Sequence, residues 1–298
     1  MDLVELCAGG PQLSPIVAGA WRMADWGWDA RQRLRWIEQC VDLGVTSFDH
    51  ADLYGGYSVE GLFGEALALA PSLRERIQLV SKCGIRLVCG ARPENRIKHY
   101  DTSAAHIVRS VENSLRELRT DHLDLLLIHR PDALMDADAV AGAFASLRAA
   151  GKVAHFGVSN FTPAQFELLH SRFPLTTNQI ELHPLHLAPL LDGTLDQCQR
   201  LRVRPMIWSP LAGGGLLWRQ DDAARRVQAV LGSLAQRHGT SPATLAFAWL
   251  LRHPSGAVPV AGSGRIEALR DAVAALHLRL DAQDWTDIWQ AAAGHEVA

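Results

Sequence analysis

Eight short apolar segments alternate with amphipathic segments along this 298-residue chain, and this alternation is the strongest constraint on its fold. The apolar segments suit strands that are buried on both faces of a sheet. They occupy residues 16–21, 45–49, 77–82, 123–129, 153–159, 176–179, 204–209 and 257–262. Between them, apolar residues recur at helical spacing after Asp29, Thr102 and Asp138, which predicts helices there. The alternation predicts an α/β protein with a parallel sheet.

Two parallel architectures compete for this pattern. A doubly wound sheet of the dinucleotide-binding type usually carries a GxGxxG motif after its first strand, and this chain has none there. A (β/α)8 barrel needs about 250 residues before insertions, which the chain supplies. No linker-like or low-complexity tract divides it. We therefore predict a (β/α)8 TIM barrel that forms a single domain over residues 1–298.

Polar and glycine residues follow most of the predicted strands at the point where each strand ends. They are Asp49, Lys82, His129, Ser159 with Asn160, Gln179, Trp208 with Ser209, and Gly262 with Ser263. The carboxyl ends of parallel strands meet at one rim of a barrel, and that rim is where barrel enzymes hold their active sites. A single polar strand end is compatible with a turn, whereas a ring of them predicts a site.

Four residues near this rim have side chains that suit the reduction of a carbonyl group. The phenol of Tyr54 has an ordinary pKa of about 10 and is alone a weak acid. The ammonium of Lys82 favours the phenolate and should lower that pKa, while Asp49 orients the lysine. His129 can hydrogen-bond the same acceptor oxygen as Tyr54. Such a set donates a proton to the carbonyl oxygen while a hydride reaches the carbon.

The later strand ends suit a nicotinamide dinucleotide as the source of that hydride. Trp208 offers a flat face for a nicotinamide ring, and Ser159, Asn160 and Gln179 can hydrogen-bond its carboxamide. The segment 262–265 brings small residues and an arginine to the start of a predicted helix, an arrangement that suits a phosphate-binding site.

Six segments, in this order, resemble the aldo-keto reductases: FDHADLYGGYSVEGLFGEAL, VSKCG, LLLIHRPD, HFGVSNF, TNQIELHP and WSPLAGG. The likeness is closest to bacterial members with a DHADxYGGY motif, and it extends from Trp21 to residues 261–272. It implies an NADP(H)-dependent reductase of aldehydes or ketones. The catalytic residues would be Asp49, Lys82, His129 and Tyr54, with Tyr54 as the general acid.

The same resemblance implies where the cofactor binds. Positions that contact NADP(H) in the family are matched by Ser159, Asn160, Gln179, Trp208, Ser209, Leu211, Ser263 and Arg265. Trp21, Asp49 and Gly262, which lie beside them in the predicted rim, complete the predicted cofactor-binding set. NADP(H) is expected rather than NAD(H).

This sequence departs from the family pattern at several positions. Trp208 stands where tyrosine or phenylalanine is commoner in the family. His50 stands where threonine is commoner, and it can add a second imidazole near the four predicted catalytic residues. Ala268 and Ala272 align where many members hold the adenosine end with arginine and asparagine. Arg265 and Arg270 are candidates to replace them, so the strength of the NADPH preference stays open.

The bulk composition narrows the possible partners and location. A net charge of −3 gives no reason to expect nucleic acid or an anionic membrane as a partner. Five irregularly spaced cysteines without a CxxC pair predict neither a disulfide framework nor a metal site. The first ten residues lack the features of a signal peptide, so we expect a cytoplasmic protein whose partner is a small carbonyl substrate. The oligomeric state is not predicted.

Three alternatives remain open at this level. The chain can instead be an NADP(H)-binding regulatory subunit with little or no turnover. Trp21, Trp26 and Trp28 either line the substrate pocket or cover the barrel. Trp26 and Trp28, together with Trp285 and Trp289 in the tail, suggest an apolar or aromatic substrate. Ser159 and Asn160 can also cap a helix that starts near residue 163.

Overall fold

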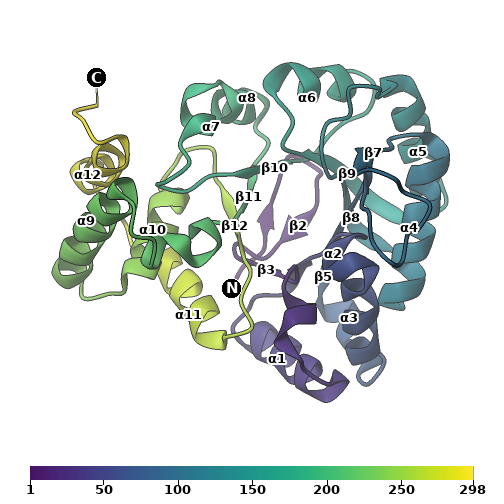
Figure 1. Cartoon of the computed structure of the whole chain (residues 1–298), viewed down its shortest axis with the longest axis horizontal. Helices are drawn as coiled ribbons and strands as arrows, with labels where there is room; N and C mark the ends of the chain where they lie inside the picture. The colour runs from purple at the N-terminus through teal and green to yellow at the C-terminus, as the bar shows by residue number, and fades with distance from the viewer. Residues whose placement is uncertain (298) are drawn as a thin grey trace.

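The computed structural model describes residues 1–297, and at its centre is a closed barrel of eight parallel strands (Figure 1). The predicted (β/α)8 barrel is therefore confirmed. In chain order the barrel strands are β3 (Val17–Gly19), β4 (Ser47–Asp49), β5 (Gln78–Cys83), β8 (Leu123–Ile128), β9 (Val153–Ser159), β10 (Asn178–Glu181), β11 (Met206–Trp208) and β12 (Val258–Ala261). The sheet closes because β12 pairs with β3. That the chain forms a single domain stays a prediction.

One helix of the outer ring follows each barrel strand. In order these are α1 (Ala30–Asp42), α3 (Val59–Leu67), α4 (Ala104–Leu118), α5 (Ala137–Ala149), α6 (Pro163–His170), α8 (Thr194–Leu201), α10 (Pro242–Leu251) and α11 (Ile266–Ala274). Additional helices are α2 (Tyr54–Tyr57), α7 (Ala188–Leu191), α9 (Asp222–His238) and α12 (Ala282–Ala293), and short 3-10 turns cover Met23–Trp26, Pro71–Arg76, Ala212–Leu217 and Ala275–His277.

The first residue of each predicted helix is set by a capping side chain. Asp29 caps α1 as expected, in a capping box with Gln32. Ser103 caps α4, and Asp136 caps α5, so these two helices begin within two residues of Thr102 and Asp138, after which the helical spacing was read.

The weakest predicted strand, 176–179, is a strand shifted by two residues, since β10 covers Asn178–Glu181. The preceding threonines still contact the neighbouring strands: Thr176 N donates to Phe156 O at 2.8 Å, and Thr177 Oγ1 donates to Arg204 O at 2.8 Å. Their high strand propensity explains why the sequence pattern included them.

A small two-stranded sheet closes the amino-terminal end of the barrel. It consists of β1 (Val4–Glu5) and β2 (Gln12–Leu13), and its Leu6 and Leu13 side chains are fully buried. They pack in one cluster with inward-facing residues of the strands, namely Val17, Val80, Leu125, Leu127, Met206, Val258 and Val260. The lower part of the barrel is thus a filled core, and the opposite, carboxyl end is left for a site.

A second two-stranded sheet, β6 (Ile85–Arg86) with β7 (His99–Tyr100), lies in the long connection between β5 and α4. In Figure 1 this connection lies at one side of the barrel mouth, in front of α4. At the other edge of the molecule, α12 packs against α9, away from the mouth. Within residues 1–297, no helix combines the length and the apolar character that crossing a membrane requires.

Candidate active site

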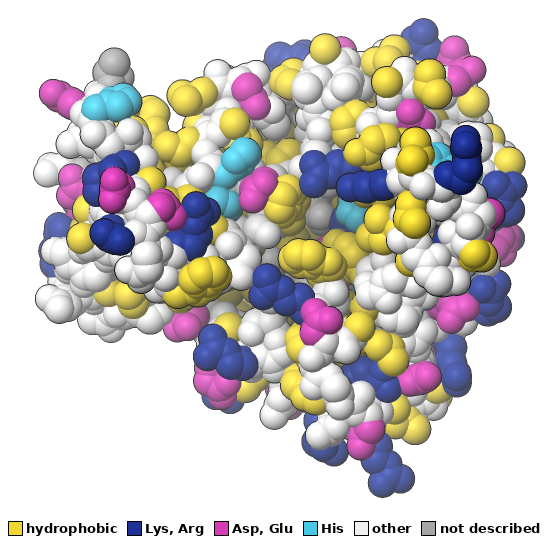
Figure 2. All heavy atoms as spheres, in the orientation of Figure 1, with side chains coloured by type: hydrophobic (Ala, Val, Ile, Leu, Met, Phe, Trp, Pro, Cys, Tyr) yellow, Lys and Arg dark blue, Asp and Glu magenta, His cyan; other side chains and the backbone are white. Residues whose placement is uncertain are grey.

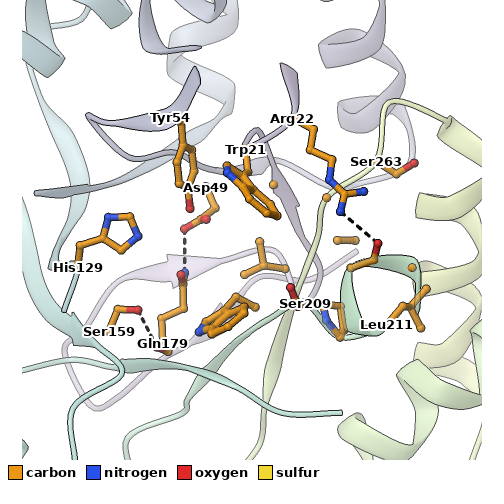
Figure 3. Close-up of a pocket in the computed structure, with 18 of the residues that line it drawn as sticks. Trp21, Arg22, Asp49, Tyr54, His129, Ser159, Gln179, Ser209, Leu211 and Ser263 are labelled. Carbon is orange, nitrogen blue, oxygen red and sulfur yellow. Dashed lines mark hydrogen bonds between the residues drawn. The ribbon is translucent and has the colours of Figure 1, made fainter. Parts of the chain in front are cut away.

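A cavity of about 590 Å³ opens at the carboxyl end of the barrel (Figure 3). The structure brings the residues of the predicted site together around it. Its lining includes Trp21, Asp49, Tyr54, His129, Ser159, Asn160, Gln179, Trp208, Ser209, Leu211, Gly262, Ser263 and Arg265. Lys82 is the one predicted site residue outside the lining, because it lies beneath the cavity with 1% of its surface exposed. Figure 3 shows Tyr54 and His129 at one end and Leu211 and Ser263 at the other.

Lys82 is the centre of a fully bonded network under the cavity floor. Its ammonium donates to Asp49 Oδ2 at 2.7 Å, to the backbone oxygen of His50 at 2.7 Å and to the Tyr54 hydroxyl oxygen at 3.1 Å. An ammonium has three donors, so all of them are used. Because the phenol oxygen accepts from Lys82, the O–H of Tyr54 is left to donate elsewhere, and the cavity lies directly beside it.

The pKa values in this network are set by burial as much as by charge. Burial raises the pKa of Tyr54; Lys82 acts against this, and Asp49 adds to it. The sequence-based expectation of a lowered pKa is therefore wrong for the net shift, since desolvation of the phenolate outweighs the ammonium. Burial lowers the pKa of Lys82, but Asp49 and Tyr54 outweigh it and the net pKa is raised, so the lysine stays charged.

His129 faces Tyr54 across the cavity as a neutral imidazole. The two rings are edge to face with 5.9 Å between their centroids. Burial, followed by the charges of Lys82, Arg130 and Lys98, holds the pKa of His129 well below its usual range. Its Nδ1 atom is buried without a hydrogen-bond partner in the described chain. His129 lines the cavity, and a neutral imidazole can hydrogen-bond a substrate oxygen there but is not a reservoir of protons.

A second network fixes the side chains on the far wall. Gln179 Nε2 donates to Asp49 Oδ1 at 2.8 Å, which joins this wall to the Lys82 network. Asn160 Nδ2 donates to Ser159 Oγ at 2.8 Å, and Trp208 Nε1 donates to Asn160 Oδ1 at 2.9 Å. The bond from Trp208 to Asn160 locks the indole plane. Asn160 has a φ of 61°, a left-handed backbone conformation that is uncommon for residues other than glycine.

The groups that these networks leave open fit a nicotinamide dinucleotide. The Gln179 side-chain oxygen and one amide hydrogen of Asn160 remain free within residues 1–297, and together they complement a carboxamide. The indole of Trp208 lines the cavity beside them. Further along, Ser263 and the exposed Arg265 precede α11, whose amino terminus favours an anion. NADP(H) would therefore be held by Trp208, Asn160 and Gln179 at one end and by Ser263 and Arg265 at the other.

Ser159 and Asn160 do not cap the following helix. Thr162 caps α6, and it forms a capping box with Gln165. The alternative helix-cap interpretation of the strand-end pair is therefore wrong.

The tryptophans divide between the two roles that the sequence left open. Trp21 lines the cavity and is 56% exposed. Trp26 and Trp28 instead support the loop after β12, since a Cβ built on Gly264 would lie 3.0 Å from the Trp26 ring and 3.1 Å from the Trp28 ring. In the tail, Trp285 stacks on Trp249 at 5.1 Å, remote from the lining. The aromatic-substrate interpretation of these residues loses its basis.

Two other sequence-based suggestions are corrected by the structure. Arg270 is outside the cavity lining, and its Nη1 atom lies 3.6 Å from Glu267 Oε1. Of the two candidate arginines, Arg265 alone lines the cavity, beside Ala268. His50 does not add a second imidazole to the site. Its ring packs on Phe63 at 4.5 Å, and burial, followed by the charge of Lys82, lowers its pKa to about 3.

Several lining residues were missed by sequence reading. They are mainly basic or apolar, and they include Arg22, Lys98, Arg130, Leu53, Ile85 and Leu87. The signal for Arg130 was its position directly after His129, whereas Lys98 lies in a long connection without a strand pattern. Arg22 Nη2 donates to Gly213 O at 3.1 Å and so joins the loops after β3 and β11.

Metal ligation has no support in the described part of the chain. Residues 1–297 contain no group of three or more His, Cys, Asp or Glu side chains placed to hold a metal ion.

Comparison with known proteins identifies relatives over nearly the whole chain. A model of the aldo/keto reductase family matches residues 15–293. Oxidoreductase YdhF of Escherichia coli strain K12 is 54% identical over 99% of this chain and 98% of its own length. A 6-dehydroglucose reductase of Agrobacterium fabrum is 45% identical over 96% of this chain and 97% of its own. The crystal structure of an aldo-keto reductase from Klebsiella pneumoniae in complex with NADPH is 26% identical, with a TM-score of 0.79 over 97% of this chain and 94% of that one.

These matches cover nearly the whole chain, and they include a family model and relatives well above the identity at which a shared family is in doubt. The closed barrel of eight parallel strands agrees with the fold of the aldo-keto reductases among the solved structures. The chain belongs to the aldo/keto reductase family.

Proposed function

We propose that this oxidoreductase uses NADPH to reduce an aldehyde or ketone to the alcohol, with Tyr54 as the general acid. The observation that carries the proposal is the bonding of Lys82. Its three donors are all used, one of them on the Tyr54 oxygen, so the phenol proton is available to the cavity. The named likenesses to an oxidoreductase and to an NADPH-bound structure support the same class of reaction.

The chain's own residues divide the work as follows. When bound, the cofactor supplies the hydride that reaches the carbonyl carbon. Tyr54 donates its proton to the carbonyl oxygen, and the charged Lys82 stabilises the phenolate that remains. His129, neutral and facing Tyr54, holds the same oxygen in place through a ring nitrogen. Asp49 keeps Lys82 charged and, through Gln179, ties it to the wall that would hold the carboxamide.

The substrate is a small carbonyl compound, and the relatives suggest where to begin. Because two relatives are named 6-dehydroglucose reductases, a sugar aldehyde is one reasonable member of a first panel. A simple aromatic aldehyde and an aliphatic ketone complete it. We expect NADPH to serve better than NADH, since Arg265 lines the end of the cavity where the additional phosphate would lie.

The test is NADPH oxidation by the purified protein, followed by absorbance, with and without each carbonyl compound. The alcohol product is identified by mass spectrometry, and the assay is repeated with NADH. Oxidation that depends on the carbonyl supports the proposal. Tight NADPH binding, measured by quenching of tryptophan fluorescence, without turnover of any carbonyl would overturn it in favour of a regulatory subunit.

A further inference from the structure

The charged side chains that line the cavity are almost all of one sign. Four basic residues lie in the lining, Arg22, Lys98, Arg130 and Arg265, against one acid, Asp49. That acid is already bonded to Lys82 and Gln179. Figure 2 shows dark blue basic side chains bordering the central hollow, beside a cyan histidine. The cavity therefore presents positive charge that no carboxylate of its own lining neutralises.

The basic residues lie on two sides of the mouth, and only one side suits the cofactor. Around the closed sheet the order is β12, β3, β4, β5, β8, β9, β10, β11, so β8 stands four strands from β12 and faces it across the barrel. Arg265 follows β12, next to the predicted phosphate-binding site. Arg130 follows β8, and Lys98 lies in the connection that leaves its neighbour β5. A dinucleotide held by Trp208 on β11 and by Ser263 after β12 would place its phosphates beside β12, on the side away from Lys98 and Arg130, although Arg130 also contacts the Trp208 ring.

Neither cation is neutralised within the described chain. Arg130 lies over the Trp208 ring, 5.5 Å from its centroid, and forms no ion pair there; Lys98 likewise has no acidic partner among residues 1–297. The acid nearest to Arg130 in sequence is Asp132, and it is otherwise engaged. Its Oδ2 accepts from Thr102 Oγ1 at 3.0 Å, and its Oδ1 accepts from the backbone N–H of Leu134 at 2.9 Å.

Both charges act on the imidazole of His129, and that of Arg130 also acts on the phenol of Tyr54. The charges of Arg130 and Lys98 contribute, after burial and Lys82, to the low pKa of His129. Arg130 also opposes, weakly, the effect of burial on the pKa of Tyr54. Leu53, Ile85 and Leu87 line the same side of the cavity and provide apolar surface there.

From this arrangement we propose that the substrate is an aldehyde or ketone that carries an anionic group, a carboxylate or a phosphate, which Arg130 and Lys98 bind. The inference rests on the proposed function, because it names the substrate class of the same site. The carbonyl lies between Tyr54 and His129, the anionic group lies toward β5 and β8, and a hydrocarbon or aromatic spacer contacts the apolar side chains. Arginine suits this role because its planar fork can bind two oxygens at once.

The first experiment compares two substrates that differ in charge. Wild-type protein with NADPH is given 4-carboxybenzaldehyde and the methyl ester of the same acid. The ester group withdraws electrons more strongly, so intrinsic reactivity favours the ester. We expect the carboxylate to have a kcat/KM about tenfold or more above that of the ester, as charge-assisted hydrogen bonds would give. A sugar aldehyde phosphate against the free sugar aldehyde repeats the comparison with the second anion.

Variants then locate the effect. Lys98→Met and Arg130→Met should each lower kcat/KM for the carboxylate several-fold and leave the ester little changed, and Arg130→Lys should recover part of the loss. Lys152→Met is the matched control, because Lys152 pairs with Glu112 before β9, at the opposite end of the barrel. The KM for NADPH is measured in every variant, since Arg130 also contacts Trp208.

The outcomes separate this inference from the function on which it rests. Equal kcat/KM for the carboxylate and the ester would overturn the inference and leave the reductase standing. Equal losses on both substrates in Arg130→Met and Lys98→Met would also overturn it, because the residues would then serve the cofactor or the fold. If neither compound nor any other carbonyl is reduced, the proposed function fails and the inference fails with it.

Discussion

The lower and upper parts of the barrel interior are built by the same strands and yet have opposite chemistry. On β5, Val80 lies in the apolar core and Lys82 lies under the cavity. On β8, Leu127 belongs to that core and His129, two residues later, lines the cavity. Because inward-facing positions of a strand recur every second residue, a step of two residues leads from the apolar core to the candidate active site.

This difference shows how a barrel can separate stability from reactivity. The lower layer stabilises the fold by removing apolar surface from water. The upper layer buries a charged pair, Lys82 with Asp49, whose desolvation is costly unless every donor and acceptor finds a partner. All three donors of Lys82 do so. Substitutions in the two layers should therefore affect different measurements.

The largest effect is expected at the top of the barrel. Tyr54→Phe removes the proposed general acid and should lower kcat by about 10²–10⁴-fold. NADPH affinity, followed by fluorescence quenching, should be retained, because the phenol oxygen contacts Lys82 rather than the carboxamide wall. Tyr100→Phe is the matched control, since Tyr100 is 41% exposed and lies outside the cavity lining. Turnover near the wild-type level in Tyr54→Phe would contradict the role assigned to this layer.

The opposite result is expected one layer lower. Leu127→Ala removes a fully buried side chain from the barrel core, and we expect the free energy of unfolding in urea to fall by about 2–5 kcal/mol. The kcat of the protein that remains folded should stay close to wild type. Leu168→Ala, at a position 47% exposed, is the control and should change stability little. A large loss of kcat without a loss of stability in Leu127→Ala would show that the layers are not separate.

The smallest of the three effects concerns Ser81, a residue of β5 whose side chain bonds to the surrounding helix α3. Ser81 lies between Val80 and Lys82 and donates to Glu60 Oε1 on α3 at 2.6 Å. Burial raises the pKa of Glu60 from 4.5 to about 8. The unfolded chain therefore ionises Glu60 at lower pH than the folded protein does, so its contribution to stability is present below about pH 4.5 and is lost as the pH rises toward about 8.

Glu60→Gln removes this titration while keeping an oxygen for Ser81 to bond. Relative to wild type, the variant should gain stability as the pH rises through that range, by roughly 1–4 kcal/mol in the free energy of unfolding. Asp52, whose pKa burial raises to about 7, also helps to raise the pKa of Glu60, so the difference between the two proteins includes the interaction of these two carboxyl groups. The pH profiles of kcat should coincide. If the free energies of unfolding of the two proteins change with pH in parallel, Glu60 does not cause this pH dependence.

The sequence predicted the barrel and most of its rim because both depend on local, periodic signals. Apolar runs predict strands, and polar residues at their ends, such as Asp49, Lys82 and Gln179, predict a site wherever the strands are parallel. Lys98 could not be found this way, because the segment 84–102 has no strand or helix period that places it over the mouth. The directions of Trp26, Trp28 and His50 also escaped prediction, since each depends on packing against residues distant in sequence. The net pKa shift of Tyr54 was wrong because burial is not visible in a sequence.

The placement of the two cation groups on opposite sides of the mouth has a consequence for how such a protein can change over time. Lys98 lies in the connection between β5 and α4, and the residues proposed to bind the cofactor phosphate, Ser263 and Arg265, follow β12. On the proposed roles of Lys98 and Arg130, exchange of the connections after β5 and β8 would change which substrates bind, while the segment after β12 and the folded core stay the same.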